Sequence, residues 1–198
     1  MKKITATELN SILASHKLWL ETSGVQVQRA DLENANLTGA ILTGAILTGA
    51  ILTGAILRDA NLEGANLSDA NLKYADLTGA NLTDANLKDA TLYYADLRGA
   101  NLLGANLKGA NLGGSFLRYA DLTDADLTGA DLNGANLTDA DLTDADLTGT
   151  NLEKKAEKKA EKQTEVASVN AESSIRSEIE AIAKKHGMKI DSISLSFI

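Results

Sequence analysis

The stretch GAILTGAILTGAILTGAIL, residues 39–57, repeats one five-letter word almost without change. The same period runs from Ala30 to Lys154 as 25 consecutive words of the form Ala-(Asn/Asp)-Leu-x-x, with leucine in the middle of every word. In a helix, five residues place each leucine about 140° from the previous one, so the leucines would scatter around the surface. In a strand, an odd period would put successive leucines on opposite faces. The chain must therefore turn a corner once per word, with each leucine pointing inward.

The last position of each word supports a corner there. Of the 25 words, 13 end in Gly, seven in Asp and one in Asn, and these residues tolerate tight turns and positive φ. One coil cannot bury its own leucines, so the core forms only when coils stack at about the 4.8 Å spacing of paired strands. Burying a leucine contributes about 1.5–3 kcal/mol gross, which gives a thin rod a sufficient core. The sequence therefore predicts an all-β solenoid.

The run ADLTGANLTDANL, residues 75–87, resembles the pentapeptide-repeat protein family. The leader HKLWLETSG followed by QRADL, residues 16–24 and 28–32, is similar to a segment that precedes the repeats in many bacterial members. The resemblance implies a right-handed quadrilateral β-helix; period five alone does not separate three sides from four. With four sides, residues 20 apart stack, and 25 words at four per coil give 6.25 coils, a column of about 30 Å.

The first 29 residues are expected to form an N-terminal capping helix and leader, because solenoid ends expose core and need a cover. Thr5 and Glu8 fit a capping box. The apolar face of this helix, to which Trp19 also contributes, comprises Leu9, Ile12, Leu13, His16 and Leu20.

After the repeat segment, residues 30–154, the sequence predicts a charged helical spacer over 155–170, whose apolar residues are mostly alanines. A helix–strand appendage is expected over 171–198, with a helix that ends at Gly187 and a tail of alternating apolar residues. Such an appendage is too small to fold unaided, so it docks on the last coil, on another copy or on a partner. We expect a homodimer through this C-terminal segment.

Composition and motifs argue against catalysis. The chain has no Cys, which excludes disulfides and thiol zinc sites, and no run of about 18 apolar residues for a membrane span. The repeats contain no His, and an interior of Leu and Ala has no room for a pocket. The run Asp124–Gly129 imitates an EF-hand loop, but its twelfth position is Ala135 instead of Glu. We expect a cytoplasmic, non-enzymatic protein with no catalytic residue, cofactor, metal, membrane or direct nucleic-acid partner.

The residues that differ from word to word lie on the outer surface. In a four-sided coil, Tyr74 stacks with Tyr94, beside Tyr93, and Arg98 stacks with Arg118 on the next side. Tyr and Arg are the residues that protein interfaces favour. The candidate partner-binding residues are Tyr74, Tyr93, Tyr94, Arg98, Phe116, Arg118 and Tyr119. The alternative is that large residues at corners only shield the edges of the coil.

The net charge of −8 is concentrated, because residues 121–150 hold eight Asp and no Lys or Arg. Four sides per coil would stack these carboxylates in rows, and like charges opposed across a ladder are destabilising. One interpretation is mimicry of nucleic-acid phosphates, since some members of the family bind DNA gyrase as acidic, duplex-like rods. The alternative is that Asn and Asp are interchangeable in this slot. The candidate acidic face comprises Asp121, Asp124, Asp126, Asp141, Asp144 and Asp146.

Four isoleucines occupy the slot just before leucine on four successive sides: Ile41, Ile46, Ile51 and Ile56. They form a collar around the coil, with one isoleucine on each side. Such a collar could seat a partner or the leader's Leu18 and Trp19. The near-identical words favour recent duplication, in which isoleucine was simply copied.

Overall fold

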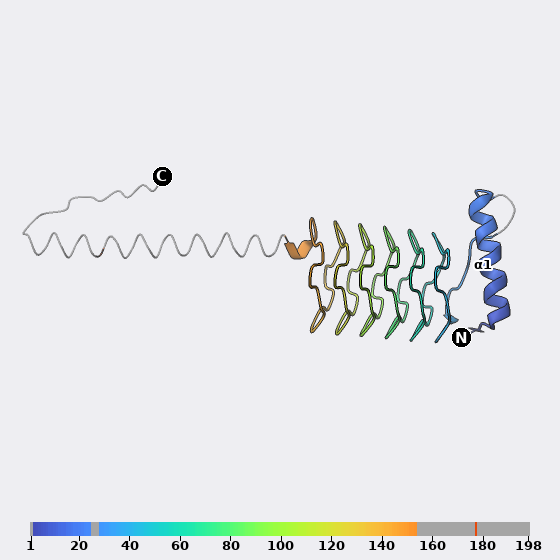
Figure 1. Ribbon diagram of the computed structural model, residues 1–198, viewed down its shortest axis with the longest axis horizontal. Coiled ribbons are helices and arrows are strands. Elements are labelled where there is room, and N and C mark those ends of the chain that lie inside the picture. Colours follow the sequence, from blue (N-terminus) through green and yellow to red (C-terminus); the bar gives the residue numbers. More distant parts are fainter. Residues whose placement is uncertain (1, 25–27, 154–176, 178–198) are drawn as a thin grey trace, which may run out of the picture. The chain divides into compact units, whose positions relative to one another are not determined.

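The computed structural model describes residues 2–24, 28–153 and 177 (Figure 1). The chain divides into two units, Met1–Glu153 and Lys154–Ile198. The expected spacer (155–170) and appendage (171–198) lie outside the described residues, apart from Ser177. The domain boundaries given above therefore stay predictions, and the fold below is that of the first unit.

The repeats form a stack of coils in which every isolated β-bridge is parallel and joins residues 20 apart, as Asn61 and Asn81. Four words therefore make one coil, and the prediction of four sides is confirmed. Residues 30–149 form six coils, seen edge-on in Figure 1. We number the sides in chain order: side 1 begins with the word of Leu32, side 2 with Leu37, side 3 with Leu42 and side 4 with Leu47.

Backbone hydrogen bonds link each word to the next coil and close its corner. The Leu82 N–H donates to the Asn101 carbonyl at 2.7 Å, and the Asp84 N–H donates to the Leu103 carbonyl at 2.9 Å. The corner is a turn in which the Ala85 N–H donates to the Leu82 carbonyl at 3.0 Å, with a positive φ at the third residue as in type II turns. All the Gly, Asp and Asn residues at the end of words 30–149 have positive φ, as their types predict.

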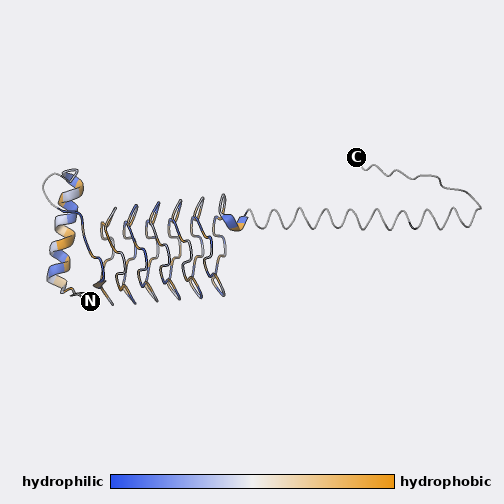
Figure 2. Cartoon of the chain, turned by 180° about the vertical axis from the view of Figure 1, so that it is seen from behind, coloured by the Kyte–Doolittle hydropathy of each residue, from blue (hydrophilic) through white to orange (hydrophobic). Residues whose placement is uncertain are grey.

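The core is a column of leucines and alanines. The middle leucines from Leu32 to Leu132 are at most 3% exposed, whereas Leu137, Leu142 and Leu147 in the sixth coil are only half-buried. Figure 2 shows hydrophobic and hydrophilic residues together in the coils. The leucine and alanine of each word lie inside, and the other three positions face outward.

The slot before leucine favours Asn or Asp because its side chain accepts a backbone hydrogen bond. The Asn81 Oδ1, for example, accepts the N–H of Thr83 at 3.1 Å, and the same contact recurs in most words. An isoleucine in this slot provides no acceptor. The isoleucine collar is uneven: Ile41 is 81% exposed and Ile46 is 43% exposed, while Ile51 and Ile56 are half-buried.

Helix α1, Ala6–Glu21, packs on the first coil and begins with the predicted capping box between Thr5 and Glu8. Its Leu9 is buried in the core, and Ile12 and Leu13 pack against it. A two-residue strand precedes the helix: β1, Lys2–Lys3, pairs in parallel with β2, Ala35–Asn36, on side 2 of the first coil. Strand β1 was not predicted from the sequence.

His16 joins α1 to the first coil. Its side chain is fully buried, its Nδ1 accepts the Ala30 N–H at 3.0 Å, and its ring stacks on Trp19 with 5.5 Å between centroids. Burial lowers the pKa of His16, the backbone of Thr48 opposes this shift, and Arg29 lowers the pKa further. The hydrogen bond requires an unprotonated Nδ1, so the neutral ring is the form that fits.

Of the last predicted word, residues 150–154, the described residues 150–153 do not continue the coil, so the structure shows six coils and not the expected 6.25. Residues 151–153 are helical instead. Thr150 caps this turn, because its Oγ1 accepts the Glu153 N–H at 3.3 Å while the Glu153 carboxylate accepts the Gly149 N–H. The sequence TNLE, residues 150–153, is a capping box, which starts a helix.

Candidate functional site

Three tyrosines gather at the corner between sides 1 and 2 in the third and fourth coils. The rings of Tyr74 and Tyr94 are parallel, with 6.0 Å between centroids, and Tyr93 meets Tyr94 edge-on at 4.4 Å. Tyr74 is 60% exposed and Tyr94 46%. The neighbouring Tyr94 hydroxyl raises the pKa of Tyr93. We call these three residues the tyrosine cluster; the sequence predicted their proximity from the 20-residue spacing.

The backbone of the corner tyrosines lies in the left-handed region. The φ angles are 58° at Tyr74, 55° at Tyr94 and 61° at Tyr119. A residue with a Cβ loses about 1–2 kcal/mol in this conformation, and a bulky residue there is an outlier. The word pattern alone could have revealed this strain, because all other corners of the six coils carry Gly, Asp or Asn.

A pair of glycines in the next coil seats two of the rings. A Cβ on Gly113 would lie 3.0 Å from the Cδ2 of Tyr93, and a Cβ on Gly114 would lie 2.5 Å from the Cε1 of Tyr94. Gly114 also needs its positive φ, but Gly113 does not have one. The Tyr93 ring therefore explains why glycine stands at 113, a position that sequence reasoning missed although only this word contains two glycines.

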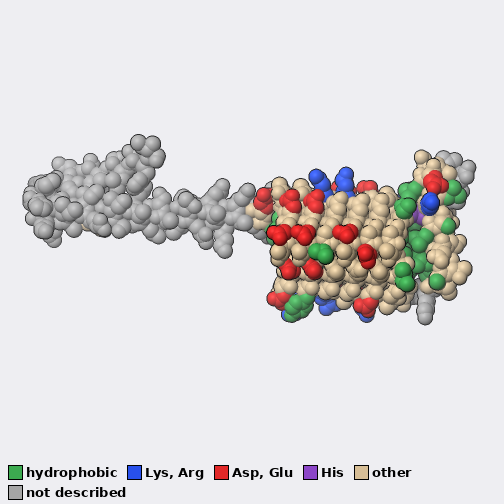
Figure 3. All heavy atoms as spheres, viewed as in Figure 1, with side chains coloured by type: hydrophobic (Ala, Val, Ile, Leu, Met, Phe, Trp, Pro, Cys, Tyr) green, Lys and Arg blue, Asp and Glu red, His purple; other side chains and the backbone are tan. Residues whose placement is uncertain are grey.

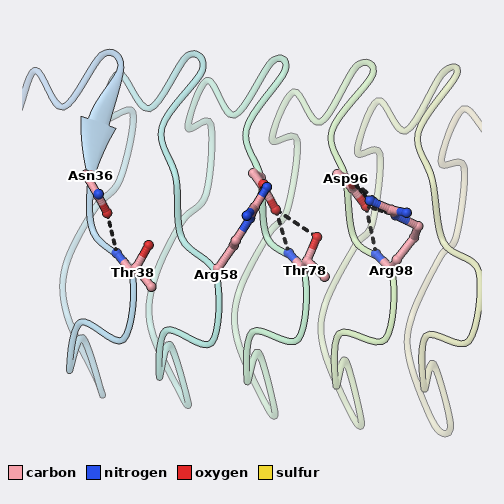
Figure 4. Close-up of polar contacts among 7 residues, drawn as sticks. Asn36, Thr38, Arg58, Thr78, Asp96 and Arg98 are labelled. Atoms are coloured by element: carbon pink, nitrogen blue, oxygen red, sulfur yellow. Dashed lines mark hydrogen bonds and ion pairs between the residues drawn. The ribbon is translucent and has the colours of Figure 1, made fainter. Parts of the chain in front are cut away.

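On side 2 the arginines are held by carboxylates. Arg98 makes a two-pronged ion pair with Asp96, with Nε–Oδ1 at 2.8 Å and Nη2–Oδ2 at 2.6 Å (Figure 4). Burial raises the pKa of Asp96, but hydrogen bonds from the Arg98 side chain and backbone outweigh it and leave this pKa below its usual range. On the same side, the Arg58 Nε of the second coil contacts the Asp76 Oδ2 of the third coil at 2.5 Å.

The rest of the predicted patch lies in the fifth coil. The Arg118 guanidinium stacks over the Tyr119 ring at 4.4 Å, donates to its hydroxyl, and lies 3.7 Å from the Asp139 Oδ2. Phe116, 44% exposed, occupies the slot that elsewhere holds Asn or Asp, and with Asp96 and Arg98 it lines a hollow of about 290 Å³. We call Arg98, Phe116, Arg118 and Tyr119 the arginine cluster. Arg98 and Arg118 share a side, but each has its own partner.

The acidic residues lie on two sides of the last two coils. Asp121 is bridged to Asp141 on side 3, and Asp126 to Asp146 on side 4; the corner residues Asp124 and Asp144 belong to side 3. Figure 3 shows acidic side chains at this end of the solenoid.

Local hydrogen bonds stabilise two of these carboxylates in the charged form. The side chain and backbone N–H of Thr143 lower the pKa of Asp141, and Thr148 does the same for Asp146. Repulsion between stacked carboxylates alone would raise both pKa values. At these two positions the local hydrogen bonds favour the charged carboxylate.

The family model for pentapeptide repeats matches the chain in eight copies over residues 23–59, 52–84, 65–104, 85–124 and 120–154. The chain belongs to the pentapeptide-repeat family. Family membership implies a right-handed quadrilateral β-helix, in agreement with the four-sided coils. No curated protein matches the chain.

Solved structures of pentapeptide-repeat proteins resemble the chain. Rfr23 from the cyanobacterium Cyanothece 51142 is 29% identical, with 70% of this chain and 97% of Rfr23 covered and a TM-score of 0.44. HetL from the cyanobacterium Nostoc sp. strain PCC 7120, involved in heterocyst differentiation regulation, is 38% identical, with 63% and 68% covered and a TM-score of 0.34. Full-length QnrB1, a plasmid-mediated fluoroquinolone resistance protein, is 20% identical, with 61% and 83% covered and a TM-score of 0.39.

A second hollow of this pentapeptide-repeat chain lies between α1 and the first coil. Its volume is about 750 Å³, and apolar or uncharged polar residues line it, among them Ile4, Leu9, Asn10 and the exposed Ile41. Across residues 2–24 and 28–153, His and acidic side chains form no group of three or more that could hold a metal ion. In the same part of the chain, no helix has the length and apolar character that a membrane crossing needs.

Proposed function

We propose that the chain is a non-enzymatic, rigid scaffold that binds a protein partner through the tyrosine and arginine clusters. The observation that carries this proposal is the left-handed backbone of three exposed tyrosines. Family membership and the four-sided solenoid support the rigid scaffold. The proposed contact residues are Tyr74, Tyr93, Tyr94, Arg98, Phe116, Arg118 and Tyr119.

The strain distinguishes binding from simple shielding of the coil edge. Each corner tyrosine destabilises the fold by about 1–2 kcal/mol relative to a glycine in the same conformation, yet its side chain does not contribute to the core. Tyr93 covers the neighbouring glycine from a position without positive φ, so shielding does not require the strained corners. Backbone strain concentrates at functional sites.

The arginine side chains of the proposed binding surface are already held in place by neighbouring residues. The Asp96 carboxylate fixes the Arg98 guanidinium, and Tyr119 fixes that of Arg118. Side chains that are already ordered lose less conformational entropy when a partner binds. Tyrosine and arginine are the residues in which interface hot spots are enriched.

The test replaces two corner tyrosines by a residue that the corner accepts. A Tyr74→Asn/Tyr94→Asn variant keeps a side chain suited to positive φ and removes both rings. Cross-linking and mass spectrometry would identify proteins bound to the wild type, and the Kd of the purified partner would be measured. We expect the double variant to weaken binding by about 2 kcal/mol or more, roughly 30-fold. Asp69→Asn, at the corresponding corner of side 4, is the matched control; equal binding by all three chains contradicts the proposal.

A second candidate function rests on the charge of side 3. Its words hold six acidic residues and no Lys or Arg: Glu63, Asp84, Asp121, Asp124, Asp141 and Asp144. As the alternative, this acidic face, with Asp126 and Asp146 on side 4, mimics nucleic acid and binds a DNA enzyme such as DNA gyrase. Inhibition of gyrase supercoiling that is relieved when Asp121, Asp126, Asp141 and Asp146 become Asn would support it. Two results would exclude this function: no inhibition of gyrase by the wild type, or inhibition that is unchanged when the four Asp residues become Asn.

Assembly, capping and location complete the proposal. We expect α1 to cap the first coil, residues 171–198 to mediate a homodimer, and the protein to act in the cytoplasm. Light scattering on the full chain and on a chain ending at Lys154 tests the dimer. A dimer that becomes a monomer on truncation supports it, and two monomers contradict it.

A further inference from the structure

Asn133 and Gly134 form the one Asn–Gly pair of the sequence. They lie on side 1 of the sixth coil, where Gly134 is the corner with φ +72°, and both are exposed. An Asn–Gly pair is chemically distinctive because the glycine nitrogen can attack the asparagine side-chain carbonyl without obstruction from a Cβ. In a folded chain, this attack depends on the hydrogen bonds that the glycine N–H and the asparagine side chain make.

The Gly134 N–H lacks the hydrogen bond that protects its counterparts. At the same corner of earlier coils, the Tyr94 N–H donates to the Gly113 carbonyl at 2.9 Å and the Gly114 N–H to the Asn133 carbonyl at 2.8 Å. The counterpart for Gly134 would be the Glu153 carbonyl, but the chain leaves the coil at Thr150 and becomes helical. Within the described part of the chain, the Gly134 N–H donates to no acceptor.

The side chain of Asn133 is anchored beside this free nitrogen. Its Nδ2 donates to the Asp131 Oδ1 at 2.6 Å, and its backbone N–H donates to the same oxygen at 2.9 Å. Its own side-chain carbonyl makes no hydrogen bond to a described residue. In the usual slot, by contrast, the Asn111 Oδ1 is occupied by the Gly113 N–H, and the following Leu112 N–H is bonded to the next coil.

We infer that Asn133 is a site of spontaneous deamidation. The Gly134 nitrogen loses its proton and bonds to the Asn133 Cγ, the Cγ–Nδ2 bond breaks, and ammonia leaves, which closes a five-membered succinimide. Water then adds to either carbonyl of this ring and gives aspartate or isoaspartate at position 133. Water is the only co-reactant, and each product is one dalton heavier than the starting chain.

The modification changes the surface next to the tyrosine cluster. Asn133 stands in the same column of side 1 as Gly113 and Tyr93, each 20 residues from the next. A carboxylate at 133 replaces the hydrogen bond to Asp131 by repulsion between like charges. The isoaspartate form also adds a methylene to the main chain inside the turn that the Ala135 N–H closes on the Leu132 carbonyl. The chemical step does not depend on the proposed function.

The test follows the intact protein during incubation at mildly alkaline pH, with peptide mapping by mass spectrometry and an enzymatic assay for isoaspartate. Asn136 is the internal control, because it lies in the same coil and no described residue accepts the N–H of the following Leu137. It differs in that Leu137 has a side chain and that Thr138 donates to the Asn136 Oδ1. A synthetic peptide of residues 128–139 gives the rate without the fold. The Asn133→Gln variant is the second control, since glutamine would have to close a larger ring.

We expect the one-dalton shift and isoaspartate to appear at Asn133 before any other asparagine of the described coils, and to be lost in Asn133→Gln. Two results would overturn the inference. One is an unmodified Asn133 in the folded chain after the peptide has been converted. The other is conversion of Asn136 as fast as that of Asn133, which would mean that the glycine after Asn133 does not direct the reaction.

Discussion

Replacing Gly114 by alanine tests whether the tyrosine cluster is seated as the structure places it. A Cβ at this position would lie 2.5 Å from the Cε1 and 2.8 Å from the Cδ1 of Tyr94, so the ring must move. The φ of +64° adds backbone strain of about 1–2 kcal/mol for alanine. Forcing the ring off its rotamer costs about 0.5–1.5 kcal/mol, and losing its pairing with Tyr74 costs a similar amount.

Gly99 and Gly64 separate the strain from the displacement of the ring. Both are corner glycines with φ near that of Gly114, at +63° and +61°, and a Cβ on either would meet no atom within 4 Å. Gly99→Ala and Gly64→Ala should therefore lower the free energy of unfolding by the strain alone, about 1–2 kcal/mol. Gly114→Ala should lower it by about 1–3 kcal/mol more, which is the contribution of the seated ring.

Urea denaturation measures the stabilities, and near-ultraviolet circular dichroism reports the packing of the tyrosines. We expect the tyrosine signal to fall in Gly114→Ala and to stay unchanged in Gly99→Ala. Equal losses of stability and equal spectra in the two variants would contradict this placement of the ring, because Tyr94 would then not rest over Gly114. The proposal that the binding surface is ordered before a partner binds would then lose the support of the tyrosine cluster.

Three further predictions concern single side chains, and denaturation curves check each. Ile41→Asn should stabilise the protein by about 0.5–1.5 kcal/mol, because the Thr43 N–H gains an acceptor and the isoleucine is 81% exposed; a loss of stability would show that its side chain packs usefully. Leu92→Ala, at a fully buried site, should cost about 2–5 kcal/mol, and a cost below 1 kcal/mol would contradict a close-packed column. Because the folded pKa of His16 lies below its ordinary 6.5, its contribution to stability is complete above that pH and is lost as the pH falls toward the folded value. His16→Gln, which can still accept the Ala30 N–H, should remove this pH dependence, and an unchanged slope would contradict the role of His16.

The coil was predictable because its determinants repeat. An odd period excludes helix and flat strand, and Gly or Asp at the end of a word predicts the positive φ found at Gly99 and Asp84. The number of sides was not predictable from the period, because a triangular and a square coil place the same word on each side. It came from the family resemblance, and the bridges between residues 20 apart confirm it.

Other features were not predicted from the sequence, and the physical reason differs from one feature to the next. Strand β1 consists of Lys2 and Lys3, which have no strand pattern, and it is held by backbone bonds to residues 35 and 36. The helix after Thr150 was readable as a capping box, but Leu152 also fits the repeat and concealed it. Within the candidate site, the spacing predicted that Tyr74 and Tyr94 stack, whereas the pairing of Arg98 with Asp96 depends on side-chain geometry that spacing does not encode.

The departures from the repeated word gather on one part of the solenoid surface. In the slot before leucine, only Thr91 and Phe116 are neither Asn, Asp nor Ile, and both lie on the sides and coils of the tyrosine and arginine clusters. The strained corner tyrosines and the conformationally unnecessary Gly113 lie there as well. Each of the four isoleucines also forgoes the hydrogen bond of this slot, but they are spread one to a side among near-identical neighbours, as copying would leave them. Duplication of a word does not explain several different kinds of substitution on one surface. Their grouping there is the reason to search for the partner at this surface.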